Sequence, residues 1–269
     1  DALVHVVRCF ENPEQFTENA DPSRDAEDLD TELILADMEV VERRLDKARK
    51  AAKSGDKKSK REGEMCEALL AHLSDGKPAR SFEFTGQDQD ILQDGGLLTV
   101  KPVIYAANLD EDGMSALADN ENFKALSAYA EKQGSAVLLV AAKFEEDIAE
   151  MDAEEAELFM QDLGLTETGL DRLIRTSYDL LGYISFLTAG EDDVHAWTIV
   201  RGTKAPKAAG KIHTDIERGF IRAEIVAFED LKACGSMAAA RDKGLIRLEG
   251  KDYVMQDGDV TQFRFNVSK

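Results

Sequence analysis

The sequence predicts an α/β protein that is interrupted by a helical arm and followed by a smaller α+β module. Three observations lead to this prediction: short apolar runs typical of buried strands, one stretch with a 3.5-residue apolar repeat, and alternating strands after residue 183. A hydrophobic content of 43% is ordinary for a globular chain, and no apolar stretch is long enough to cross a membrane.

Residues 1–10 are predicted to form a buried strand, which Glu11-Asn12-Pro13 ends. The chain opens directly in this apolar run, without an initiator methionine or a polar lead-in. We therefore expect it to be a fragment of a longer protein. A second turn, at Asp21-Pro22, precedes the helical arm.

Residues 21–96 are predicted to form an antiparallel helical hairpin. Apolar residues at alternating spacings of four and three make a coiled-coil seam: Ile34, Met38, Val41, Leu45, Ala48 and Ala52. Ser54-Gly55-Asp56 interrupts the repeat, and Cys66, Leu69 and Leu73 resume it. One amphipathic helix packed on a core is the alternative, but the glycine-centred break favours the hairpin. A further short helix is expected over 88–98.

The net charge of −21 argues against a protein that coats nucleic acid over its whole surface. The window Arg43–Arg61 is the exception, because ten basic residues there face only two acidic ones, a net charge of +8. Eight of the basic residues form what we call the basic tip: Lys47, Arg49, Lys50, Lys53, Lys57, Lys58, Lys60 and Arg61. An anionic partner is the predicted function of the tip, and a solvated hairpin end is the alternative.

A strand at Pro102–Ala107, a helix over 120–133 and a strand at Ala136–Ala142 predict a parallel sheet. The first of these strands delivers Asn108-Leu109-Asp110-Glu111 at its carboxyl end, where ligands bind in open α/β sheets. An amide followed three residues later by an acid suits the reading of a nucleobase, although an ordinary strand-to-helix turn has the same pattern. No G-x-x-x-x-G-K-S/T phosphate loop occurs in the chain.

The remaining features predict ordinary structure. The acidic stretch 144–163 is interpreted as a solvated helix face rather than a metal site, because its carboxylates are scattered. Cys9, Cys66 and Cys234 lie far apart and are expected to be free thiols in a reducing cytoplasm. After residue 183, strands at 197–200, 220–226, 253–255 and 261–267 predict a mixed sheet.

Longer motifs point to a family. The runs Phe186–Gly190, His195–Thr198 and Ala205–Glu224 resemble the TGS module of YchF-type, Obg-like ATPases. This likeness is extended by Glu249–Tyr253, Gln256–Val260 and Phe265–Val267. Three segments near the start of the chain resemble the same family: Asp1–Asn12, Asp21–Asp25 and Thr31–Asp37. The similarity therefore covers essentially the whole chain.

The resemblance implies a domain organisation. Residues 1–20 and 97–182 would form part of a P-loop, Rossmann-like nucleotide domain, residues 21–96 a coiled-coil insertion, and residues 183–269 a β-grasp TGS domain. The phosphate loop, the switch I region, the Asp-x-x-Gly segment and the Mg²⁺ ligands would all precede Asp1. We therefore expect no catalytic or metal residue here, and no ATP hydrolysis by this chain alone. Relatives also tend to carry a histidine within the loop at 13–19, and this chain has none there.

The resemblance also implies a base site for ATP. Guanine-specific relatives use Asn-Lys-x-Asp, whose Asp accepts two hydrogen bonds from guanine. Here Glu111 replaces that Asp, which removes the preference for guanine, and Leu109 takes the position of the Lys. Asn108 would hold the base edge or the loop, Phe10 would pack on the base, and Ala142 belongs to the final base-contacting loop.

The resemblance implies a cytoplasmic, ribosome-associated ATPase whose basic tip contacts rRNA phosphates, with no membrane partner and no recognition of DNA sequence. A second RNA- or protein-facing surface is expected on the TGS-like domain: Arg201, Lys204, Lys207, Lys211, Arg218 and Arg222. The alternative is a non-enzymatic RNA- or protein-binding adaptor on a degenerate nucleotide fold. An intact phosphate loop upstream would favour the ATPase. An oligomerising coiled coil would need a longer seam.

Overall fold

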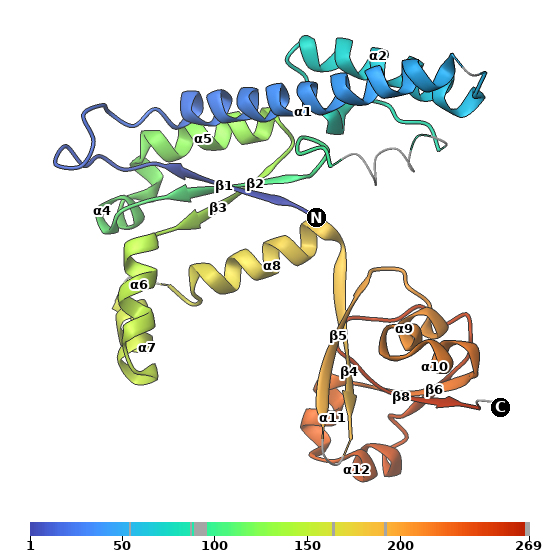
Figure 1. The fold of residues 1–269 in the computed structure, drawn as a ribbon. Coiled ribbons are helices and arrows are strands. Elements are labelled where there is room, and N and C mark those ends of the chain that lie inside the picture. Colours follow the sequence, from blue (N-terminus) through green and yellow to red (C-terminus); the bar gives the residue numbers. More distant parts are fainter. Residues whose placement is uncertain (54, 87, 89–95, 163–164, 191–192, 267–269) are drawn as a thin grey trace. The chain divides into compact units, whose positions relative to one another are not determined.

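A computed structural model describes residues 1–53, 55–86, 88, 96–162, 165–190 and 193–266 (Figure 1). The chain divides into two compact units, Asp1–Ser177 and Tyr178–Lys269, which we describe separately as unit 1 and unit 2. In the described part of the chain, no helix is both long and apolar enough to span a bilayer.

Unit 1 is built on a three-stranded parallel sheet in the order β1-β2-β3. The strands are β1 (Leu3–Arg8), β2 (Val103–Asn108) and β3 (Ala136–Val140). The central strand β2 is buried on both faces, as its continuous apolar run predicts. The parallel sheet is thus confirmed. The expected strand at Ala136–Ala142 was too long by two residues, because Ala142 already opens a helix.

Helices pack against this sheet, and further helices come after it in the sequence. The helices of unit 1 outside the arm are α4 (Glu111–Ser115), η2 (Leu117–Asp119), α5 (Glu121–Lys132), α6 (Ala142–Glu150) and α7 (Ala153–Asp162). Helix α8 (Gly169–Leu181) begins in unit 1 and ends in unit 2. The arm helix α1 and α5 contact the sheet, and Val7, Tyr105 and Leu126 meet in the core between them. The acidic stretch 144–163 is split into α6 and α7, because the Asp152 carboxylate accepts from the amides of Glu154 and Glu155 and starts a new helix.

The arm is the predicted hairpin of α1 (Pro22–Ala52) and α2 (Lys57–Ser74), followed by η1 (Ala79–Ser81). Figure 1 shows the two long helices side by side, and their apolar seams form one core. The buried members of that core are Ile34, Val41, Leu45, Cys66, Leu69 and Leu73. The turn uses Gly55 at φ +86°, a conformation that favours glycine. The helix expected over 88–98 lies largely outside the described residues.

Two carboxylates of α1 fasten the arm to the rest of unit 1. Asp37 is 1% exposed and accepts hydrogen bonds from Leu98 N, Thr99 N and Thr99 Oγ1 at 2.7, 2.8 and 2.6 Å. Asp30 Oδ2 accepts from the hydroxyls of Tyr105 and Tyr129 at 2.6 and 2.8 Å. Burial, reinforced by these bonds to Asp30, raises the pKa of both tyrosines. Asp30 therefore joins the arm directly to β2.

Unit 2 contains the predicted mixed sheet, in the order β5-β4-β8-β6-β7. Its strands are β4 (Tyr183–Ala189), β5 (Val194–Val200), β6 (Phe220–Ala227), β7 (Arg247–Glu249) and β8 (Asp259–Phe265). β4 and β8 are parallel, and the other pairs are antiparallel. The helices are α9 (Ala205–Ile212), α10 (Thr214–Arg218), α11 (Phe228–Cys234) and α12 (Met237–Asp242). α9 packs Ala208 and Ala209 into a core with Phe186, Ile225 and Phe263.

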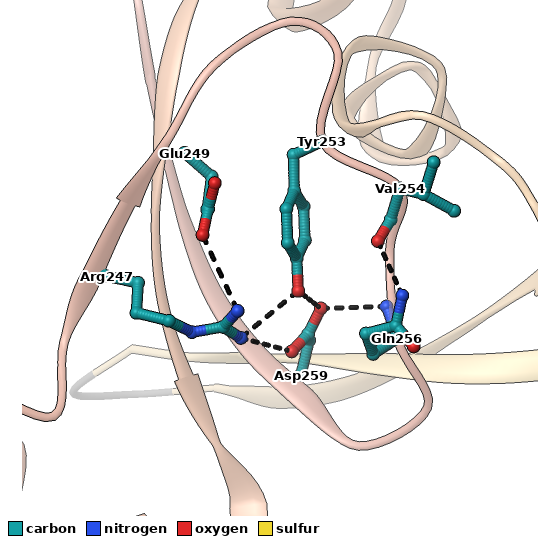
Figure 2. A network of polar contacts seen from close by, with 6 residues as sticks. All are labelled: Arg247, Glu249, Tyr253, Val254, Gln256 and Asp259. Atoms are coloured by element: carbon teal, nitrogen blue, oxygen red, sulfur yellow. Dashed lines mark hydrogen bonds and ion pairs between the residues drawn. The ribbon is translucent and has the colours of Figure 1, made fainter.

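The predicted strand at 253–255 is wrong. Figure 2 shows the reason: Asp259, 2% exposed, accepts hydrogen bonds from Tyr253 Oη and Gln256 N at 2.9 Å and from Arg247 Nη2 at 3.3 Å. These bonds fold residues 253–256 into a loop over the start of β8. Only an isolated bridge between Lys204 and Val254 remains in this segment.

Candidate nucleotide-base site and basic tip

A cleft of about 280 Å³ lies at the carboxyl ends of β2 and β3. Its lining is Leu109, Asp110, Glu111, Asp112, Ala141, Lys143 and Phe144. Two loops that are far apart in sequence thus form one concave surface. This is the edge of a parallel sheet at which ligands bind in α/β folds.

Asn108 joins the two loops. Its side-chain Oδ1 accepts a hydrogen bond from Ala142 N at 3.0 Å, and Leu109 N donates to Val140 O at 2.8 Å. We call the bond between Asn108 and Ala142 the loop clasp. The clasp uses one lone pair of Oδ1, and the amide nitrogen of Asn108 remains able to donate to a ligand.

The next three residues turn the chain into α4. Leu109 forms the floor of the cleft, and its side chain is 2% exposed in the core of the sheet. Asp110 Oδ1 accepts from Gly113 N at 2.8 Å and caps α4. This cap places Glu111 at the first position of the helix, exposed and on the lining of the cleft.

The loop after β3 contributes a cation that is already paired. Lys143 Nζ lies 3.1 Å from Glu146 and 2.9 Å from Asp147, and these two carboxylates raise its pKa. Phe144, 2% exposed, stacks on Phe159 with 5.1 Å between ring centroids and closes one wall. Sequence reasoning missed Phe144, because extending the strand to Ala142 hid the start of α6.

Three predicted base contacts are not on the lining of the cleft: Asn108, Ala142 and Phe10. Ala142 is exposed and takes part through its backbone amide, not as a lining side chain. Phe10 is partly buried and packs edge-on against Phe16, with 6.3 Å between centroids. The guanidinium of Arg8 in turn lies 4.2 Å from the ring of Phe16. Phe10 is not on the lining of the cleft, and its contact with a base stays a prediction.

The basic tip is exposed throughout, but part of its charge is neutralised within the hairpin. Arg49 pairs with Glu67 at 2.8 Å, Lys60 with Glu64 at 3.9 Å, and Arg61 with Asp88 at 3.5 Å. The other five residues form no ion pair with any residue that the structure describes: Lys47, Lys50, Lys53, Lys57 and Lys58.

The count of +8 overstated the available charge, because the window ended just before Glu62, Glu64 and Glu67. Within the window, Asp56 caps α2, and hydrogen bonds from Ser59 and from the Lys58 amide lower its pKa. The tip therefore keeps a fixed negative charge close to its lysines.

The second basic surface expected on unit 2 is largely paired. Lys204 lies 2.8 Å from Asp252, Lys207 2.5 Å from Glu217, Arg218 3.9 Å from Asp215 and Arg201 4.0 Å from Asp179. Within the described ranges, no three His, Cys, Asp or Glu side chains gather as they would around a metal ion.

Comparisons with known proteins agree with this architecture. A family model described as YchF-GTPase_C, "Protein of unknown function (DUF933)", matches residues 183–266. The chain is 49% identical to the Bacillus subtilis "Ribosome-binding ATPase YchF" and 44% identical to the Escherichia coli O157:H7 protein of the same name. These matches cover 99% of this chain and 74% and 73% of the two relatives.

The structure of a Schizosaccharomyces pombe YchF GTPase superposes with a TM-score of 0.82 at 33% identity, over 98% of this chain and 72% of that one. A Pyrococcus horikoshii GTP-binding protein shares the fold at 22% identity, with a TM-score of 0.61 over 98% of this chain and 78% of the other. The chain spans about three quarters of the length of its curated relatives. Because close relatives match from one end of the chain to the other, it belongs to the YchF family.

Proposed function

We propose that this chain forms the base-binding half of a ribosome-associated ATPase that prefers ATP to GTP. The observation that carries the proposal is the loop clasp, which joins the two chain segments that line the cleft and follows directly on into the lining residues Leu109 and Glu111. The names of the bacterial relatives, which call those proteins ribosome-binding ATPases, support it.

The base preference follows from hydrogen-bond chemistry. Guanine offers two adjacent donors that a correctly placed Asp carboxylate accepts together. Glu111 occupies that place with one more methylene, which displaces the carboxylate from the guanine donors. Asn108 donates through its amide nitrogen, and both purines present an acceptor at N7. The clasp thus binds a purine, and Glu111 removes the preference for guanine.

The phosphates need a different part of the protein. Phosphoryl transfer depends on a phosphate-cradling loop, its lysine and Mg²⁺, and these 269 residues contain no G-x-x-x-x-G-K-S/T motif. We place the phosphate loop and the Mg²⁺ ligands outside them, so this chain alone should not hydrolyse ATP. β1 is an edge strand that exposes Val4 (43%) and Val6 (60%), an apolar surface on which that part can pack.

The ribosome contact is assigned to the five unpaired lysines of the basic tip. Their exposed ammonium groups suit the phosphates of rRNA, and such contacts weaken as salt rises. Unit 2 fits the expected TGS domain, since its parallel pair β4–β8 lies at the centre of a mixed sheet backed by α9. We propose a cytoplasmic location for the protein.

Calorimetry on the full-length protein tests the proposal. ATP should bind more tightly than GTP, and equal or reversed affinities would contradict the role given to Glu111. The absence of a phosphate-loop motif from these residues favours a second candidate, a non-enzymatic adaptor. The adaptor predicts that neither nucleotide binds while the ribosome still does.

A further inference from the structure

The sheet of unit 2 ends on one side at an unprotected edge strand. β5 is seven residues long and contains no Lys, Arg, Asp, Glu or Pro. Proteins normally protect sheet edges with charges, prolines, bulges or very short strands. The opposite edge strand, β7, has such protection, because it is three residues long and two of them, Arg247 and Glu249, are charged.

The register shows which backbone groups of β5 point outward. Gly190 N donates to Asp193 O at 2.8 Å, and Arg201 N donates to Gly182 O at 2.7 Å. The ladder between β4 and β5 runs without a bulge, and antiparallel partners bond at every second residue. The odd-numbered residues of β5 therefore face β4. The N–H and C=O groups of Val194, Ala196 and Thr198 point away from the sheet.

Exposed apolar side chains lie at the two ends of β5. Val194 is 70% exposed and Val200 is 55% exposed, one at each end of the strand. The residues just beyond the ends carry opposite charges: Asp193 precedes β5 and Arg201 follows it, and both are exposed. Arg201 forms a distant pair with Asp179, at 4.0 Å.

We propose that β5 pairs with β5 of a second copy of this chain, antiparallel about a twofold axis at Trp197. In this register Ala196 lies opposite Thr198 of the second copy, and the two exchange backbone hydrogen bonds through their outward-facing groups. Val194 lies opposite Val200 of the second copy, which makes an apolar cross-strand pair at each end. The two five-stranded sheets become one sheet of ten strands.

The charges favour a second copy over an unrelated strand. In the same register Asp193 falls opposite Arg201 of the second copy, at both ends of the pair. Pairing two identical strands can place like charges opposite each other. The middle of β5 has no Lys, Arg, Asp or Glu, so this pairing avoids that repulsion. One strand pair buries less than the about 1,200 Å² of the smallest standard interfaces, and the chain has a net charge of −21. The dimer should therefore be weak, with a Kd of about 10 µM or higher.

Sedimentation equilibrium of this chain, from about 5 to about 500 µM, tests the proposal. Ala196→Pro removes an outward-facing N–H without breaking a bond to β4 and should weaken the dimer at least about tenfold. Circular dichroism checks that this variant folds. Independently, Asp193→Lys and Arg201→Glu should each weaken the dimer, and the double variant should restore it, which a folding defect would not.

Two results would overturn the proposal. If the chain stays monomeric at every concentration, β5 does not pair with a second copy, and the partner for this edge would be a strand of another protein. A dimer that withstands both Ala196→Pro and the single charge reversals would have to form through another surface. Hydrogen exchange adds a local readout, since the amides of Ala196 and Thr198 should exchange more slowly as the concentration rises.

Discussion

The base cleft and the basic tip place their functional groups by different means. Next to the lining residue Leu109, Asn108 is held by a hydrogen bond to a residue 34 positions later, and Asp110 caps the helix that presents Glu111. At the tip, the lysines are exposed, and acids on the same helix or on the other helix of the hairpin neutralise some of the neighbouring basic residues. The motif thus marked residues that hydrogen bonds hold in place, whereas the count of charges did not show which basic residues are unpaired.

The largest effect is expected at the loop clasp. Asn108→Ala removes both the acceptor for Ala142 N and the donor left for a base, and should weaken ATP binding at least about 30-fold. Asn108→Asp is the comparison variant, because its carboxylate keeps an acceptor for Ala142 N and replaces the donor with a negative charge. Titration of both variants by calorimetry separates the two roles. Unchanged affinity in Asn108→Ala would show that the cleft is not the base site.

A smaller effect is expected at the tip, where two triple variants remove equal charge. Replacement of the unpaired Lys50, Lys53 and Lys57 by Gln should weaken ribosome co-sedimentation by about tenfold at 0.1 M salt and reduce the salt slope by about 2. The same change at the paired residues Arg49, Lys60 and Arg61 should have a lesser effect. Equal losses would mean that ion pairing within the hairpin does not govern the contact.

An effect on stability, not on binding, is expected where the arm joins the sheet. Asp30→Ala leaves the hydroxyls of Tyr105 and Tyr129 without their acceptor and should lower the free energy of unfolding by about 1–2 kcal/mol. Asp28→Ala, on the same helix, is the control. Asp28 makes only an exposed pair with Arg24, and its loss should cost less than about 0.5 kcal/mol in urea denaturation. If both variants lowered the free energy of unfolding equally, Asp30 would not stabilise the attachment of the arm to the sheet.

Features encoded locally were predictable. The hairpin follows from an apolar repeat and a glycine turn, and the central strand of the parallel sheet follows from its continuous apolar run. Features that depend on distant partners were not. The segment 253–256 has the composition of a strand, but Asp259 draws it into a loop. The end of β3 likewise depends on Asn108, which bonds the amide of Ala142 from a different strand.

The central claim is that Glu111 sets the base preference of the cleft. The most direct test is the ratio of ATP to GTP affinity in the full-length protein, before and after Glu111→Asp. Asp returns the carboxylate to the position that accepts the paired guanine donors, and a bidentate contact of this kind is worth about 1–3 kcal/mol. We predict that the ratio shifts toward GTP by about tenfold or more. An unchanged ratio would contradict the role of Glu111.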